Sequence, residues 1–455
     1  MGKPIILIVS NSYRASPSND YFGLKRKVMR VHPLAPYILA AQTPSHFNIK
    51  ICDIEDVEDY YSHEDIALAA FSTNVTRVVP KMYKVSEKFH GKNIPVVWGG
   101  IHASSVPSEV LNQGIGSVVI GQGEGIWPVL LDDLVAKRLK EVYFGSPSAV
   151  YTLLPEERAA ISGKSSFTAD GENYLGMASP DWSYLNHKPQ LLQVVATRGC
   201  ENRCPHCSGY KVAGNSFQMK DIGLVVNEIE ESLSHSQRKY VIFADNNLSQ
   251  NPVYANELMQ AITRFNARYI SMASMPQLVE NETIVEKMAK AGMDTICIGF
   301  ETLNQLSHKG NDKDVSKYAY GIELLHKHGI AVFGSFILGF DEDTQASVDQ
   351  ILGFCDDNKI DLINANVLTP FPGTILYNKL TKEGRIETTD YLLFDTKHAL
   401  ISTPNFTRQE LQKEFDRFSR EAYSAKRIFK RVASKYGTRL SKALNLLEFI
   451  ALKKN

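Results

Sequence analysis

The chain reads Arg198-Gly199-Cys200-Glu201-Asn202-Arg203-Cys204-Pro205-His206-Cys207 directly after an apolar run over residues 191–196. This stretch holds three of the six cysteines in the 455 residues. A structural zinc site needs four closed ligands, usually from repeated cysteine pairs, and the sequence has no second pair. Three thiolates instead suit an iron–sulfur cluster with one open iron, flanked by the ring of His206. Zinc is the alternative interpretation.

Outward from this stretch, strand and helix patterns alternate six times. The expected strands are Leu191–Ala196, Lys239–Ala244, Tyr269–Ala273, Thr295–Gly299, Ile330–Leu338 and Leu362–Val367. The expected helices are Ile222–Leu233, Asn256–Phe265, Glu282–Ala291, Ser316–His328 and Thr344–Cys355. Six repeats predict a partial (β/α)6 barrel, and in barrels the catalytic groups gather at the carboxyl ends of the strands.

A second alternating pattern fills the amino-terminal third of the chain. The expected strands are residues 4–9, Ile49–Cys52, Ile66–Phe71, Val96–Trp98 and Ser117–Ile120, with helices at Leu34–Ala41 and Val79–Phe89. This alternation predicts a doubly wound, Rossmann-like parallel sheet with a ligand site beyond the carboxyl ends of its strands. Small and polar residues follow those ends, which would let a large ligand approach the backbone.

The CxxxCxxC spacing after a strand resembles the cluster motif of the radical S-adenosylmethionine (SAM) enzymes. In that family the three cysteines Cys200, Cys204 and Cys207 would hold a [4Fe-4S] cluster whose open iron binds SAM. Further motifs resemble the family in the same order along the chain. They are Gly299-Phe-Glu-Thr, Phe336-Ile-Leu-Gly-Phe-Asp-Glu-Asp-Thr and Leu368-Thr-Pro-Phe-Pro-Gly.

The resemblance also implies which residues contact SAM. Asp245 and Asn246 would lie at the amino group, Ser274 at the carboxylate and Glu301 at the ribose hydroxyls. Gly339 belongs to the segment that passes the adenine and ribose. Each has a structural alternative, since Asp and Asn satisfy local turns and Asp341 or Asp343 could cap the next helix.

The amino-terminal pattern is similar to the cobalamin-binding domain that precedes many radical SAM cores. The residues that carry this likeness are Ser72, Thr73, Gly99, Gly100, His102, Gly121, Gly123 and Glu124. The Asp-x-His-x-x-Gly motif of other cobalamin enzymes is absent, so the resemblance implies cobalamin bound base-off, without a protein imidazole. His102 is then expected near the nucleotide tail or capping a turn.

We therefore expect four regions: a cobalamin-binding domain over 1–150, a linker over 151–190, the radical SAM barrel over 191–385 and a small helical region over 386–455. Basic residues prevail after Arg420, and Leu440, Leu444, Leu447 and Ile450 form an apolar stripe. Such a stripe packs on the protein's own core or contacts a membrane surface or an anionic substrate. Cys52, Cys297 and Cys355 are expected to be buried small hydrophobes.

Charge and hydropathy narrow the classes of partner. Fifty basic and fifty acidic side chains cancel, which gives no general argument for a nucleic acid partner. The longest apolar stretch, Ile330–Phe340, falls short of the roughly 18 residues of a membrane span. No signal peptide pattern opens the chain, so a cytoplasmic protein is expected, and that reducing compartment suits free thiols and a cluster.

The resemblance implies an enzyme that cleaves SAM to a 5′-deoxyadenosyl radical and, with cobalamin, methylates an unactivated carbon of a small-molecule or lipid substrate. A flavodoxin or ferredoxin would supply the electron. The alternative enzyme is a non-methylating cyclase, ring-contracting enzyme, dehydratase or deoxygenase acting on a natural-product, sugar or tetrapyrrole scaffold. A sensor of light or redox state is the alternative outside enzymes.

Overall fold

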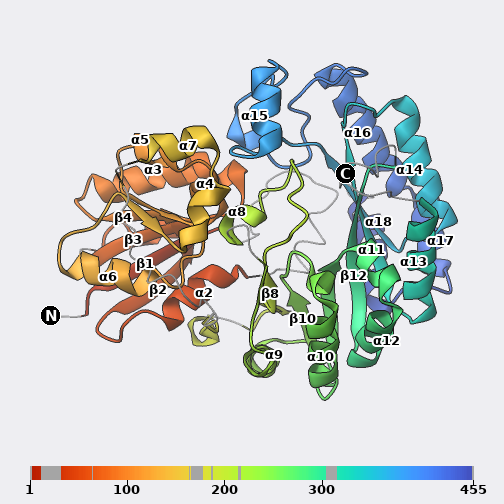
Figure 1. The fold of residues 1–455 in the computed structure, drawn as a ribbon, viewed down its shortest axis with the longest axis horizontal. Helices are drawn as coiled ribbons and strands as arrows, with labels where there is room; N and C mark the ends of the chain where they lie inside the picture. Colours follow the sequence, from red (N-terminus) through yellow and green to blue (C-terminus); the bar gives the residue numbers. More distant parts are fainter. Residues whose placement is uncertain are drawn as a thin grey trace.

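The computed structural model describes residues 3–11, 32–63, 65–162, 164, 178–185, 188–213, 217–303 and 315–452. Figure 1 shows an amino-terminal parallel sheet in red to orange on one side and a curved sheet with outer helices in green to blue on the other. Much of the expected linker, including Gly163, lies outside the described residues. Its described part contains helix α7 (Pro155–Ala160), so this part of the linker is more regular than expected.

The amino-terminal sheet has six parallel strands in the order β2-β1-β3-β4-β5-β6. The strands are β1 (Ile5–Ser10), β2 (Asn48–Asp53), β3 (Ile66–Ser72), β4 (Val96–Gly99), β5 (Ser117–Ile120) and β6 (Val142–Phe144). Five were expected, and the three-residue strand β6 was missed because it is too short to show a pattern. In this order the chain turns from one direction to the other between β1 and β3, where doubly wound sheets bind ligands.

Apolar cores lie on both faces of this sheet, because alternate residues of each strand point to opposite sides. Leu7, Phe71 and Trp98 belong to one core, and Ile6, Ile8 and Val97 to the other. The accompanying helices are α2 (Leu34–Ala41), α3 (Val79–His90), α4 (Gly100–Ser105), α5 (Pro107–Asn112) and α6 (Trp127–Val135). The expected doubly wound architecture is confirmed.

The second sheet is also parallel and six-stranded, in the order β14-β13-β12-β11-β10-β7. Its strands are β7 (Leu192–Val194), β10 (Tyr240–Phe243), β11 (Arg268–Ala273), β12 (Met293–Glu301), β13 (Ala331–Leu338) and β14 (Leu362–Val367). The outer helices are α9 (Ile222–His235), α10 (Pro252–Ile262), α11 (Met275–Glu280), α12 (Glu282–Ala291), α13 (Val315–Lys327) and α14 (Gln345–Asp357). The expected partial barrel is confirmed.

Helix α10 begins four residues earlier than the sequence pattern suggested. The side chain of Asn251 accepts a hydrogen bond from the backbone N–H of Tyr254 at 3.0 Å, and Pro252 occupies the first turn. Both features favour a helix start, because proline needs no N–H partner there and asparagine satisfies an orphan N–H. The apolar periodicity alone pointed to Asn256.

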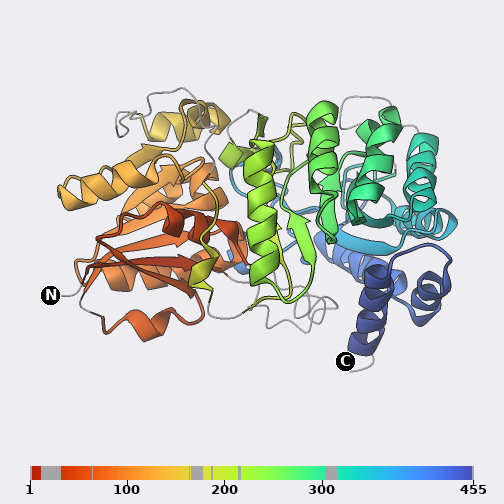
Figure 2. The same cartoon turned by 90° about the horizontal axis from the view of Figure 1, so that it is seen from below.

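Four helices follow the barrel: α15 (Ile375–Lys382), α16 (Arg408–Ala422), α17 (Ala425–Ala433) and α18 (Arg439–Leu452). Figure 2 shows the last of them in dark blue, projecting from the lower edge of the barrel. Within the described part of the chain, no helix is both long and apolar enough to cross a membrane.

Candidate functional site

The three cysteines lie in the loop between the short strand β8 (Thr197–Arg198) and the short helix α8 (Tyr210–Ala213). Gly199 has a φ of 90°, which turns the chain out of β8 just before Cys200. The backbone N–H of Cys207 donates to the carbonyl of Cys204 at 3.0 Å, and that of Gly209 to the Cys207 sulfur at 3.3 Å. All three thiols are half-buried.

The donor set of this loop fits an iron–sulfur cluster. Three thiols on one short loop can each bind a different iron, and the N–H of Gly209 points at a sulfur, as backbone donors do at cluster thiolates. Among the described residues, no three His, Cys, Asp or Glu side chains gather around a point that could hold a single metal ion. Among the described residues, the fold therefore brings no fourth ligand to the three cysteines for a zinc ion.

A cavity of about 340 Å³ lies between the amino-terminal sheet and the thiol loop. Strands β1, β3, β4 and β5 contribute their carboxyl ends, while the barrel contributes β8, α8 and the ends of β7 and β10. The predicted site residues that line it are Ser72, Thr73, Gly99, Gly100, Gly121, Gly123, Glu124 and Asn246. Gly199 and Gly209, at the two ends of the loop with the three cysteines, also line the cavity, so the predicted ligand crevice adjoins this loop.

The glycines at this rim serve two different purposes. Gly100 and Gly121 have φ values of 88° and 87°, and an added Cβ would lie 2.5 Å from the carbonyl oxygen of Thr73 or 2.8 Å from Ala149 Cβ. The backbone itself therefore requires these two glycines. At Gly99 an added Cβ would meet only Val119 Cβ, at 4.0 Å, so that glycine keeps the cavity open.

His102 does not line the cavity. It is buried in α4, with its Nε2 atom 3.2 Å from the Tyr83 hydroxyl and 3.3 Å from a carboxylate oxygen of Glu109. No histidine stands among the described residues that line the cavity.

Asp245 is completely buried at the end of β10 and holds the neighbouring strand. Its carboxylate accepts hydrogen bonds from the backbone N–H groups of Ala196 and Thr197 and from the Thr197 hydroxyl, the last at 2.6 Å. Burial raises the pKa of Asp245 to about 6, against the opposing effect of these bonds. The structure therefore gives Asp245 an anchoring position, and Asn246 the position in the cavity.

The remaining predicted SAM residues lie at other strand ends of the barrel. The backbone N–H of Ser274, after β11, donates to Asn247 Oδ1 and Ser249 Oγ, each at 3.1 Å. Glu301, at the end of β12, has a φ of 61°, and the pairing register with β13 shifts there. A residue with a carboxylate side chain and a strained backbone at a strand end is typical of a functional position.

Gly339 follows β13 with a φ of 114°, and its turn is fixed by the buried carboxylate of Asp343. That carboxylate accepts from the N–H of Gly339 at 2.8 Å, the N–H of Phe340 at 3.0 Å and the hydroxyl of Thr302 at 2.9 Å. Asp343 therefore stabilises two strand ends, and Thr344 rather than an aspartate caps α14.

Sequence reasoning missed the polar bridge between the two domains. Arg198 donates to Gln122 Oε1 at 3.0 Å and pairs with the Glu124 carboxylate, and Gln122 donates to Gln218 on β9 (Gln218–Met219) at 2.9 Å. Although burial opposes ionisation, Arg198 holds the pKa of Glu124 below its usual range. The available signal was the arginine two residues before Cys200, opposite a carboxylate in a glycine-rich loop.

Two expectations about single residues need correction. Cys297 is not fully buried, since it lies half-buried on β12, whereas Cys52 and Cys355 are buried as expected. In the expected carboxyl-terminal stripe only Leu444 is fully buried, and Ile450 is 46% exposed.

Comparison with known proteins adds independent findings. Residues 194–355 match the Radical SAM superfamily model, and residues 374–444 match a domain of unknown function, DUF4070. The chain is 26% identical over 419 residues to bacteriochlorophyllide d C-12(1)-methyltransferase of Chlorobaculum tepidum, covering 89% of this chain and 85% of the relative. It is 24% identical to the anaerobic magnesium-protoporphyrin IX monomethyl ester cyclase of Cereibacter sphaeroides, over 86% and 66% of the two chains.

Among solved structures, the fold is similar to the radical SAM methyltransferase TsrM of Kitasatospora setae, determined with cobalamin and a [4Fe-4S] cluster bound. The TM-score is 0.68 at 15% identity, with all of both chains covered. The domain match includes Cys200, Cys204 and Cys207, and the fold likeness extends over the amino-terminal sheet as well. The chain thus contains a radical SAM domain over residues 194–355 and has the fold seen in TsrM.

Proposed function

We propose that this enzyme binds cobalamin base-off in the cavity between its domains and methylates an unactivated carbon of a small-molecule or lipid substrate. One observation carries the proposal: the carboxyl ends of the amino-terminal strands line the same cavity as Gly199 and Gly209, the two ends of the loop that holds the three thiols. Two cofactors held there would face each other at short range, which is what a transfer between them requires. The small residues of the lining leave room for a large cofactor.

When bound, the cluster with SAM supplies a 5′-deoxyadenosyl radical for hydrogen abstraction, and cobalamin supplies a methyl group. The chain's own residues position these groups. Cys200, Cys204 and Cys207 would hold three irons, Asn246 and Ser274 would orient SAM, and Glu301 would accept hydrogen bonds from its ribose hydroxyls. Apolar side chains such as Leu39, Val97 and Val119 form part of the cavity wall.

The relatives suggest where to look for the substrate. A bacteriochlorophyllide methyltransferase and a magnesium-protoporphyrin ester cyclase both carry names of tetrapyrrole enzymes, so tetrapyrroles are the first class to test. We also infer that the protein works in the cytoplasm and takes its electron from a flavodoxin or ferredoxin, since cluster reduction needs a low-potential donor.

The test uses enzyme reconstituted anaerobically with iron, sulfide and hydroxocobalamin, reduced chemically, and given SAM with a deuterated methyl group. Bacteriochlorophyllide d and a lipid extract serve as substrate probes. We expect 5′-deoxyadenosine together with a product that carries the deuterated methyl. Cys204→Ala should abolish both, whereas Cys355→Ala, at a buried cysteine outside the loop, should retain them.

The second candidate function is a radical SAM cyclase without methyl transfer. The similarity to the magnesium-protoporphyrin IX monomethyl ester cyclase favours it. The same assay, run with magnesium-protoporphyrin IX monomethyl ester, separates the two. Deoxyadenosine with a converted but unlabelled product would reject methylation and support the cyclase.

A further inference from the structure

Helix α17 presents an unusual outer face. Its residues Ala425, Lys426, Phe429, Lys430 and Ala433 are exposed, and they share one side of the helix because they are three or four positions apart. Phe429 is 73% exposed, more than any other large apolar side chain that the structure describes. The opposite side packs inward through Ile428, which is 2% exposed. An aromatic ring therefore stands in solvent between two lysines.

Helix α18 buries three polar side chains besides Leu444, while two of its apolar side chains face outward. Ser441, Asn445 and Glu448 are each at most 1% exposed, whereas Leu446 and Ile450 are 48% and 46% exposed. The Asn445 amide donates to the carbonyl of Asp361 at 2.8 Å, which fixes this orientation of the helix. A helix at the surface of a soluble domain normally shows the reverse pattern. The outward apolar side thus needs another explanation than core packing.

The charge around these faces is strongly one-sided. Residues 425–452 contain seven basic side chains and one acidic side chain, Glu448, which is buried. Arg427 pairs with Asp356 at 3.2 Å, and Lys430 lies 3.8 Å from the same carboxylate. Lys426, Lys435 and Arg439 are exposed. A protein with no net charge overall thus concentrates positive charge beside its most exposed aromatic ring.

We propose that the outer faces of α17 and α18, centred on Phe429, dock on an anionic membrane surface. Exposed aromatic and aliphatic side chains flanked by lysines are the pattern of helices that lie in the headgroup region. Lysine is depleted at protein–protein interfaces, so the pattern fits lipid better than a protein partner. Figure 2 shows these helices in dark blue, away from the amino-terminal sheet, and none of their residues lines the cavity. The proposal does not depend on the reaction that the enzyme catalyses.

The test is flotation of the anaerobically reconstituted full-length enzyme with vesicles of phosphatidylcholine alone and of phosphatidylcholine with phosphatidylglycerol at a ratio of about 7:3. We expect binding to the anionic vesicles that weakens as salt is raised. The pair Lys426→Gln and Lys430→Gln should weaken it about thirtyfold, since each basic residue near such a surface contributes a factor of about five. Phe429→Ser should weaken it with both lysines present.

The matched control combines Lys84→Gln and Val253→Ser, an exposed lysine and an exposed apolar residue elsewhere on the molecule. It should bind as the wild type does. Absence of binding to anionic vesicles, or equal binding by all variants, would overturn the proposal. So would light scattering that shows a dimer dissolved by Phe429→Ser, because the face would then join two copies of the chain.

Discussion

At the scale of single residues, the most unusual charge beside the thiol loop is the ammonium group of Lys211. This side chain on α8 is 1% exposed and donates to the carbonyl oxygen of Thr152. Burial lowers the pKa of Lys211 to about 8, although Glu157 and Glu156 act in the opposite direction. A buried amine of this kind stabilises the contact between α8 and the amino-terminal domain only at the cost of desolvation.

The lowered pKa predicts a specific pH dependence of stability. Between about pH 8 and 10.5 the unfolded chain binds the proton of Lys211 more strongly than the folded chain does. The free energy of unfolding should therefore rise with pH across this window, by up to about 3 kcal/mol from this group. Lys211→Met should lose that rise and should not be less stable than the wild type at pH 7.

Denaturant unfolding at several pH values measures the difference between the two proteins. Lys84→Met, at an exposed lysine, is the control and should keep the wild-type dependence. An equal rise in wild type and Lys211→Met would show that another group is responsible.

At the scale of elements, strand β8 and the loop after β5 are joined by the pair of Arg198 and Glu124. Their side chains are 16% and 12% exposed, so neither charge is well solvated. Removing one partner of a buried pair leaves the other charge uncompensated, which costs about 3–5 kcal/mol. We predict that Arg198→Met loses this much in the free energy of unfolding and that adding Glu124→Gln restores part of it.

A double-mutant cycle of Arg198→Met and Glu124→Gln, followed by thermal unfolding, measures the coupling. The same variants should show a lower yield of cluster on reconstitution, because Arg198 lies two residues before Cys200. Additive losses in the cycle would contradict the proposed bridge. Arg264→Met, at an arginine whose side chain and ion-pair partner Glu230 are 58% and 69% exposed, is the control.

The end of strand β4 offers a test of the cavity itself. Gly99 lines the cavity and has an extended backbone with a φ of −142°, so a side chain strains neither the backbone nor a close neighbour. We predict that Gly99→Leu fills the space and weakens hydroxocobalamin binding by about tenfold or more. The midpoint of thermal unfolding should hardly change.

Absorbance after gel filtration with hydroxocobalamin measures the bound cofactor. Gly353→Leu serves as the control, because an added Cβ on α14 meets nothing within 4 Å. Undiminished binding by a well-folded Gly99→Leu protein would place the cofactor elsewhere.

At the scale of the whole molecule, the amino-terminal domain is held from two sides. One contact is the bridge at Arg198, and the other comes from the segment after α15. There the Tyr391 hydroxyl donates to Glu109 at 2.5 Å, and Tyr83 donates to the same carboxylate at 3.0 Å. Although burial opposes ionisation, hydrogen bonds and the charge of His102 hold the pKa of Glu109 below its usual range. Glu109 therefore joins helix α5 to a region nearly 300 residues later.

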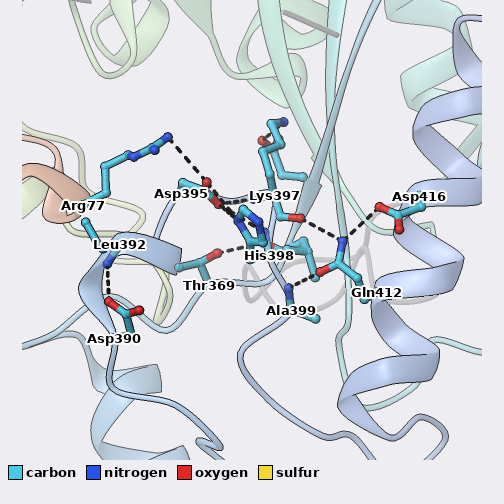
Figure 3. Close-up of polar contacts among 12 residues, drawn as sticks. Arg77, Thr369, Asp390, Leu392, Asp395, Lys397, His398, Ala399, Gln412 and Asp416 are labelled. Carbon is cyan, nitrogen blue, oxygen red and sulfur yellow. Dashed lines mark hydrogen bonds and ion pairs between the residues drawn. The ribbon is translucent and has the colours of Figure 1, made fainter. Parts of the chain in front are cut away.

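Figure 3 shows the neighbouring contact, in which Arg77 approaches Asp395 while His398 faces the same carboxylate. The Asp395 carboxylate lies 3.6 Å from Arg77 and 3.0 Å from the His398 ring nitrogen. It also accepts from the backbone N–H of Lys397 at 2.9 Å. This turn therefore adds a second ionic link between the domains.

We predict that Tyr391→Phe loosens this side of the interface. A hydrogen bond to a charged group contributes about 1.5–3 kcal/mol, so amide exchange in residues 83–109 and 388–398 should accelerate measurably. Hydrogen–deuterium exchange with mass spectrometry measures this change. Tyr151→Phe, at a tyrosine that is 66% exposed, should leave the exchange pattern unchanged. If these amides exchange at the same rate in Tyr391→Phe and in the wild type, the hydrogen bond from Tyr391 to Glu109 does not stabilise the interface.

The sequence alone was sufficient for both parallel sheets, the partial barrel and the loop with Cys200, Cys204 and Cys207. Those features depend on local periodicity and on the spacing of neighbouring residues, which a sequence displays directly. The short strand β6 was not predicted, because three residues are too few to show an alternating pattern of apolar side chains. The start of α10 differs from the prediction because the cap at Asn251 and Pro252 begin the helix before its apolar pattern starts.

Only the tertiary structure decided which polar residues meet. Asp245 became a strand anchor rather than a cavity residue, because its partner Thr197 lies on another strand, 48 residues earlier. His102 joined Glu109 and Tyr83, which lie on the neighbouring helices α5 and α3. The pairing of Arg198 with Glu124 and the outward apolar face of α18 likewise depend on how whole elements dock. Side-chain contacts across such distances follow from packing in three dimensions, which local patterns do not specify.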